Sequence, residues 1–287
     1  MTRCAGTAAG GAILSGVVAA LAARSALILL RARPPGGAAL WSRTNHAGRS
    51  VTLLEGPAYV AGSVVGVVVT AANPYADPLA LPAVVAVVCA GALGALDDLA
   101  GDSCSKGLRG HVSALREGRL TTGVVKILGL AATGLLTAVL VDRRRDGRPA
   151  ASPAATVATV AAGAVVAGMA NLVNLLDLRP GRALKAVLMP ALVSAATGRL
   201  DATVASAGGA AVGCLSDDLA GRSMLGDTGA NAAGAILGCA LIGRTALRGR
   251  VASLAVLAAL TLASEKVSFT RVIESTPVLR ELDALGR

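Results

Sequence analysis

The chain alternates between long apolar runs and short segments rich in charged residues, Gly and Pro. Apolar runs of roughly 20 residues are typical of helices that cross a lipid bilayer. We place nine such runs near residues 10–30, 52–72, 78–96, 123–141, 153–170, 184–197, 202–216, 229–243 and 251–264. The pattern predicts an all-α, polytopic integral membrane bundle of about nine transmembrane helices, with residues 1–287 forming a single domain.

The composition supports this fold class. Hydrophobic residues make up 54% of the chain and charged residues only 15%, which is hard to reconcile with a soluble globular protein. Abundant Ala and Gly suit close helix packing in lipid, where the hydrophobic effect does not pull helices together. Arg24 lies inside the first run and no clear cleavage site follows, so we expect an uncleaved first span and not a signal peptide.

The positive charge predicts the orientation of the chain. The net charge is +10, but the basic residues are dispersed and lack interleaved aromatic residues, so we expect no nucleic-acid binding. When the connecting segments are assigned alternately to two sides, most Lys and Arg fall in 31–51, 97–122, 171–183, 217–228 and 265–287. This bias makes those segments cytoplasmic and the N-terminus external in a multi-pass plasma-membrane protein, although the arginines at 143–148 oppose it.

The first candidate site is the acidic stretch GALGALDDLAGDS at 91–103. Asp97 and Asp98 end an apolar run, and Asp102 and Lys106 follow. Adjacent carboxylates on a helix point about 100° apart, so one can hold a cation while the other meets a substrate, and a lysine suits an anionic substrate. A solvated helix end is the alternative. The string DDLAG recurs at 217–221, which reflects either chance in a chain of this composition or an internal duplication.

The second candidate site is ANLVNLLDLRPGRALK at 170–185. Asn171, Asn174 and Asp177 recur every three residues, so a continuing helix would place them in one stripe of hard oxygen ligands for Mg²⁺. Three basic residues follow, namely Arg179, Arg182 and Lys185. A helix C-terminus stabilised by cations and stopped by Pro-Gly explains the basic residues equally well, but it leaves the polar stripe unexplained.

The third candidate site is MLGDTGANAAGAILG at 224–238. Glycines on both sides of Asp227 allow the backbone to approach a ligand, and the following helix start offers N–H groups to an anion. Asp227 could equally be a simple N-cap. Together the three segments bring Asp, Asn, Lys and Arg to one membrane face, which suits a Mg²⁺-bridged diphosphate.

Other common catalytic classes find no support in the sequence. His46 and His111 are the only histidines and neither lies in a nucleophile motif. The chain also contains no P-loop, no dinucleotide-binding GxGxxG after a strand and no zinc-ligand spacing.

From about residue 41 to 240, the motifs resemble the polyprenyl-phosphate N-acetylhexosamine-1-phosphate transferase superfamily. This family includes phospho-N-acetylmuramoyl-pentapeptide transferase and its GlcNAc-1-phosphate relatives. RTNHAGRSVTLLEGP at 43–57 is similar to the family's first cytoplasmic loop, and ALDDLAGDSCSKGL matches its paired-Asp motif. NLVNLLD matches the NxxNxxD motif, and LGDTGANAAGAILG the GDxGS-type motif.

The resemblance implies Mg²⁺-dependent transfer of a sugar-1-phosphate from a UDP-sugar to undecaprenyl phosphate at the cytoplasmic face, with release of UMP. It makes Asp227 the metal ligand with Asn174 beside it, and it makes Asp97, Asp98 and Asp177 catalytic. The resemblance also has Lys106 neutralise phosphate charge. We predict that the substrate-binding residues are Lys106, Asn171, Asn174, Arg179 and Arg182, the two arginines because their charge suits an anionic substrate. The implied partners are the UDP-sugar, the polyprenyl phosphate, the membrane and, as one option, a second copy of the chain in a homodimer.

The sequence departs from the family pattern after Asp177. Relatives continue DGxDGLA, whereas this chain reads DLRPGRALK, and the late cytoplasmic loop associated with sugar recognition is missing. A catalytically inactive family member that binds polyprenyl phosphate or nucleotide-sugar as a regulator or scaffold is therefore the alternative. A lipid-linked sugar transporter is a third reading, but its charges should lie at mid-depth and not at one face.

Overall fold

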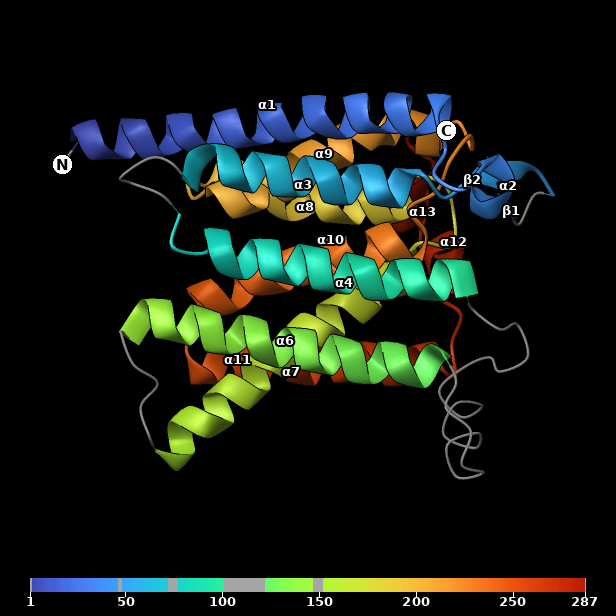
Figure 1. The fold of residues 1–287 in the computed structure, drawn as a ribbon. Helices are drawn as coiled ribbons and strands as arrows, with labels where there is room; N and C mark the ends of the chain where they lie inside the picture. Colours follow the sequence, from blue (N-terminus) through green and yellow to red (C-terminus); the bar gives the residue numbers. More distant parts are fainter. Residues whose placement is uncertain (1, 46–47, 72–76, 101–121, 147–151, 287) are drawn as a thin grey trace.

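The computed structural model describes residues 2–45, 48–71, 77–100, 122–146 and 152–286, and these form a bundle of helices with a single two-stranded hairpin (Figure 1). The elements are α1 (Thr2–Ala32), α2 (Ala38–Trp41), β1 (Ser42–Thr44), β2 (Ser50–Thr52), α3 (Glu55–Ala71), α4 (Ala80–Ala100), α6 (Thr122–Asp146), α7 (Pro153–Leu176), α8 (Arg182–Ala196), α9 (Ala202–Leu219), α10 (Gly226–Arg244), α11 (Leu247–Ser264), α12 (Phe269–Ser275) and α13 (Pro277–Ala284).

A helix occupies each of the nine predicted apolar runs, and the helices traverse the bundle in alternating directions (Figure 1). Among the described residues, five helices are long and apolar enough to cross a membrane, so the prediction of a helical membrane protein is confirmed. They comprise Ala9–Ala32, Ala80–Ala100, Thr122–Arg144, Pro153–Leu176 and Leu247–Ser264. We call the end of the bundle that carries Asp97, Asp177, Asp217 and Asp227 the motif end, and the other the opposite end.

The centre of the bundle is α10, which packs against α3, α4 and α7. Small residues allow these backbones to approach closely, because a side chain at the crossing points would separate the helices. A Cβ at Gly234 would lie 2.2 Å from the carbonyl oxygen of Met169 on α7, and a Cβ at Gly94 on α4 would lie 2.1 Å from that of Asp227. The position of α10 therefore depends on glycine contacts on two sides.

Large apolar side chains remain exposed around the outside of the bundle. On α1 they include Leu21 and Ile28, and on α11 they include Val256 and Leu262. Such a surface is unfavourable in water and favourable against lipid chains. The exposed apolar perimeter therefore agrees with a membrane environment.

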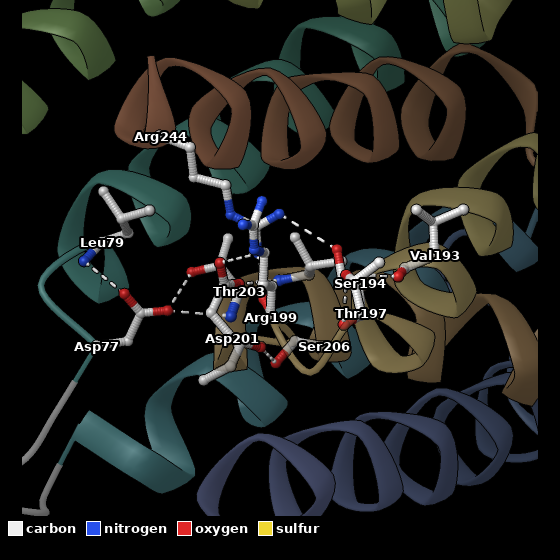
Figure 2. Close-up of polar contacts among 12 residues, drawn as sticks. Asp77, Leu79, Val193, Ser194, Thr197, Arg199, Asp201, Thr203, Ser206 and Arg244 are labelled. Carbon is white, nitrogen blue, oxygen red and sulfur yellow. Dashed lines mark hydrogen bonds and ion pairs between the residues drawn. The ribbon is translucent and has the colours of Figure 1, made fainter. Parts of the chain in front are cut away.

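At the opposite end, a network of hydrogen bonds and one ion pair connects the ends of α4, α8, α9 and α10 (Figure 2). Asp201 accepts a hydrogen bond from the Val204 N–H and caps α9, while Arg244 from the end of α10 reaches Asp201 at 2.5 Å. Asp77 accepts from both the N–H and the hydroxyl of Thr203, and its other oxygen accepts from the Leu79 N–H before α4. Arg244 also donates to Ser194 on α8. These contacts hold the opposite end together.

A second polar contact at the opposite end is a buried ion pair. Arg250 on α11 lies 2.6 Å from Asp142 on α6, and the Thr159 hydroxyl on α7 donates to the same carboxylate at 2.6 Å. A buried charge needs a partner of opposite sign and further hydrogen bonds, and this site supplies both. It joins α6, α7 and α11 through polar contacts.

Candidate active site

Two carboxylates from different helices share one lysine at the motif end. The Nζ atom of Lys126, on the second turn of α6, lies 3.2 Å from Asp97 on α4 and 2.5 Å from Asp227 on α10. All three side chains are largely buried, so water screens the pairs only weakly. The structure therefore brings Asp97 and Asp227 together, and their shared partner is a cation.

Asp98 holds the start of α10 in place. Its two carboxylate oxygens accept from the N–H groups of Asp227 and Thr228 at 3.0 and 2.9 Å, and the Thr228 hydroxyl donates to it at 2.6 Å. The residue at the N-cap position of α10, Leu225, provides no side-chain acceptor. Asp98 therefore caps α10 from a neighbouring helix, and Asp227 is not the N-cap. One carboxylate of the pair positions Asp227 while the other shares its lysine.

Asp177 lines a cavity beside this site. The cavity has a volume of about 400 Å³, and the residues around it include Asn45, Arg49, Arg179 and Asp218. The Gly226 N–H donates to the Asp177 carboxylate, and this hydrogen bond connects the cavity lining to the first residue of α10. Burial raises the pKa of the Asp177 carboxyl well above its usual range, and the nearby Asp218 carboxylate raises it further. The Asp177 carboxyl therefore loses its proton less readily than an exposed Asp.

The raised pKa predicts how stability depends on pH. A carboxyl whose folded-state pKa exceeds its unfolded value of about 3.9 favours the folded state most at low pH, and this contribution is lost as pH rises toward the folded pKa. Asp177→Asn mimics the protonated form and removes the dependence. We expect the melting temperature of the wild type in detergent to fall relative to that of Asp177→Asn between pH 5 and 8; parallel curves would contradict the assignment.

The second DDLAG string also ends a helix at the motif end, but its contacts differ. Asp217 on α9 pairs with Arg24 and Arg31 of α1 and with Arg222. Asp218 is buried beside the cavity. Asp217 and Asp218 thus differ from Asp97, which pairs with Lys126, and from Asp98, which caps α10. The two copies of DDLAG are not structurally equivalent.

The predicted polar stripe of Asn171, Asn174 and Asp177 does not face a single neighbour, because its first residue contacts α11 and its last contacts α10. Asn171 donates to the Thr261 hydroxyl on α11 at 3.2 Å, whereas Asp177 follows the last helical residue and contacts Gly226. α7 and α10 run antiparallel, and Gly234 and Gly238 face Ala170 and Val166, so Asn174 lies about one turn from Asp227. Asn174 and Asp177 thus approach the site, and Asn171 turns to α11.

The three basic residues after Asp177 meet the C-terminal helices. Arg182 is buried and forms a two-pronged contact with Asp283 of α13 at 2.8 and 3.0 Å. Lys185 donates to the main-chain carbonyl of Asp283, and Arg179 pairs with Glu274 of α12 at 3.3 Å while also lining the cavity. Of the two predicted substrate-binding arginines, Arg179 faces the cavity, and Arg182 anchors the C-terminus.

Comparison with known proteins gives no assignment. No family model matches the chain, and no curated protein matches it. The resemblance based on the three motifs therefore supports only a proposal.

Lys126 is the principal site residue that the sequence analysis missed. Its position within the apolar run 123–141 could have identified it, because a lysine inside a membrane helix is costly unless a carboxylate partner is near. Lys106 and Asp102 lie outside the described residues. Within the described ranges, no group of three or more His, Cys, Asp or Glu side chains forms a metal site.

Proposed function

We propose that this protein transfers a sugar-1-phosphate from a UDP-sugar to polyprenyl phosphate, and that the sugar is an N-acetylhexosamine. The observation that carries the proposal is the convergence of Asp97 and Asp227 on one cation at the motif end, next to a cavity lined by Asp177 and Arg179. Asp97, Asp177 and Asp227 each belong to one of the three motifs that resemble the transferase family, whereas Arg179 follows the second motif.

The donor set suits Mg²⁺. A lysine ammonium already occupies the gap between the Asp97 and Asp227 carboxylates, so this gap attracts a cation. Mg²⁺ in enzymes is commonly held by one or two carboxylates, with waters and substrate phosphates completing its shell, so no larger protein cage is needed. Asp227 and Asn174 would hold the ion, which would supply charge neutralisation to a diphosphate.

The protein's own residues have separate tasks in this reaction. Asp97 orients the acceptor phosphate and accepts its proton, so that a phosphate oxygen attacks the sugar-bearing phosphorus of the donor. The bond from that phosphorus to the oxygen of the UMP phosphate breaks, and UMP leaves. Lys126 stabilises negative charge that develops on the transferred group.

The cavity beside Asp177 is where we place the nucleotide. Its volume of about 400 Å³ falls within the range of small-molecule sites, and both Arg49 and Arg179 line it. Arginine suits phosphate because its guanidinium presents several donors in one plane. Asp177 also lines this cavity and is placed to contact the nucleotide.

We propose further that nine helices, α1, α3, α4 and α6 to α11, cross the plasma membrane. Their alternating directions place the three motifs at one end of the bundle, and the bias of Lys and Arg makes that end cytoplasmic. A UDP-sugar is a cytoplasmic metabolite, so this orientation gives it access to the site.

One observation favours a second candidate, a non-catalytic family member that binds the lipid or nucleotide-sugar. Arg182 occupies a glycine-rich stretch of the family motif and is held by Asp283 instead of facing the cavity. A scaffold or regulatory role would keep the binding surfaces without requiring turnover.

A donor screen separates the two candidates. Purified full-length protein is incubated with undecaprenyl phosphate, Mg²⁺ and a panel of UDP-sugars, and released UMP is measured, while lipid binding is measured in parallel. We expect Mg²⁺-dependent UMP release with one donor class. Lipid binding without UMP release from any donor would reject catalysis and support the scaffold.

A further inference from the structure

Three arginines surround one buried carboxylate, Asp217, at the motif end. Asp217 is 2% exposed and pairs with Arg24, with Arg31 at 2.7 Å and with Arg222 at 2.7 Å. The cluster therefore carries two more positive charges than negative ones. It lies where α1 meets α9, whereas Asp97, Lys126 and Asp227 lie on α4, α6 and α10.

The excess charge borders a cavity of about 470 Å³. We call it the Arg31 cavity; its lining includes Arg31, Arg222, Ser42, Ser50 and Thr52. The Nη2 atom of Arg31 is buried and has no hydrogen-bond partner among the described residues. A buried guanidinium nitrogen without an acceptor is unfavourable, so an added acceptor at Nη2 would stabilise the Arg31 side chain.

The chemistry of the lining suits a phosphate group. Guanidinium groups bind phosphate oxygens through paired, charge-assisted hydrogen bonds, and hydroxyl groups can donate to the same oxygens. Two arginines line the cavity. Ser42 and Ser50 also line it and hydrogen-bond to each other at 3.0 Å, which leaves one of their two hydroxyl protons to donate to a phosphate. One phosphate would offset part of the charge that Asp217 leaves uncompensated.

The cavity adjoins a surface suited to lipid chains. Arg31 lies in the last turn of α1, and Ile28 and Leu29 just before it are 54% and 69% exposed. Arg24 lies two turns further into the same apolar helix, and 44% of its side chain is exposed. Arginines near the end of a spanning helix extend toward the headgroup layer, so an acyl chain along α1 would place its phosphate at the Arg31 cavity.

We propose that the Arg31 cavity binds the phosphate headgroup of an anionic membrane lipid whose acyl chains lie along α1. Val51 lines both the Arg31 cavity and the cavity that contains Asp177, so the two sites are neighbours, but Arg31 and Arg222 do not line the Asp177 cavity. The proposal does not depend on transferase activity. A soluble phosphate compound would offer the same headgroup chemistry without the apolar contacts, and the experiment distinguishes the two sources.

Trp41 provides the measurement. It is the only tryptophan of the chain, and it ends α2, whose first residues Ala38 and Ala39 line the Arg31 cavity. The full-length protein is reconstituted in nanodiscs of phosphatidylcholine, and small fractions of brominated phosphatidylglycerol or brominated phosphatidylcholine are added. We expect roughly threefold or stronger quenching of Trp41 fluorescence by the anionic lipid at equal fractions, because the site binds the phosphate and the chains together. This preference should persist in about 10 mM inorganic phosphate, which offers the headgroup chemistry alone.

Matched variants test the site itself. Arg222→Gln removes a cavity arginine that is largely exposed, and Arg31→Lys keeps the charge beside Asp217 but removes the Nη2 donor. Arg33→Gln removes an exposed charge just past α1 that does not line the cavity. The preference should be lost in the first two variants and retained in the third, with all three retaining the wild-type melting temperature within a few degrees.

Three results would overturn the proposal. Equal quenching by the two brominated lipids in the wild type would show that no anionic lipid is selected. Equal loss in Arg222→Gln and Arg33→Gln would assign the preference to diffuse surface charge. Loss of quenching in inorganic phosphate would assign the cavity to a soluble phosphate ligand and not to a lipid.

Discussion

Replacing Gly94 by alanine is expected to abolish the candidate active site and to destabilise the protein by about 3 kcal/mol or more. A Cβ at this position would lie 2.1 Å from the carbonyl oxygen of Asp227 and 2.6 Å from the Thr228 nitrogen. Both atoms belong to the backbone of α10, so no side chain can move aside to make room. α4 and α10 must separate, which pulls Asp98 away from the N–H groups that it caps.

The measurement is the melting temperature of the purified protein in detergent, together with UMP release. Gly10→Ala is the matched control, because Gly10 lies in α1 and a Cβ there would meet nothing within 4 Å. This control should melt at or slightly above the wild-type temperature, since alanine favours helix over glycine. A Gly94→Ala variant with wild-type melting and activity would show that the candidate active site does not depend on the close contact between α4 and α10.

Replacing Lys126 by methionine is expected to make the stability of the protein depend on Mg²⁺. The ammonium group separates the Asp97 and Asp227 carboxylates, and its removal leaves two buried acids facing each other. Loss of one partner from such a cluster costs about 3 kcal/mol, which corresponds to a drop of about 10 °C in melting temperature. Mg²⁺ in the millimolar range should restore most of this loss by taking the place of the ammonium.

Arg250→Met is the matched control for this experiment. It also removes the cation of a buried ion pair, but it leaves a single carboxylate, Asp142, at the opposite end of the bundle. Both variants should lose stability, and only Lys126→Met should recover with Mg²⁺. If Mg²⁺ has no greater effect on Lys126→Met than on Arg250→Met, the gap between Asp97 and Asp227 is not a divalent cation site.

The helices could be predicted from the sequence because each depends on local hydrophobicity. The apolar runs were long enough, and the polar breaks clear enough, for each run to coincide with a helix. The weakest case is the pair α8 and α9, because α8 is short and contains Pro190, but the polar turn before Asp201 still separates them. The number of helices that cross the membrane remains a prediction, as does the orientation of the termini.

The composition of the site was predictable only in part. Asp97, Asp98, Asp177 and Asp227 could be identified because each stands out at the end of an apolar run. Their contacts depend on helix pairs far apart in sequence, so no local pattern shows that Asp98 caps α10. The same limit applies to the basic segment after Asp177, since nothing near Arg182 in the sequence indicates Asp283 as its partner.

The most direct test of the proposed function is Mg²⁺-dependent UMP release by the wild type and by Asp227→Asn, with undecaprenyl phosphate and the donor identified in the screen. Asp227 forms an ion pair with Lys126 and lies in the first turn of the central helix α10. The asparagine side chain keeps the shape of the site but removes the charge that would hold the metal ion. We predict a fall in rate of roughly a hundredfold or more in Asp227→Asn, with a melting temperature near that of the wild type. Wild-type UMP release by folded Asp227→Asn, or by the wild type in the presence of EDTA, would contradict the proposed mechanism.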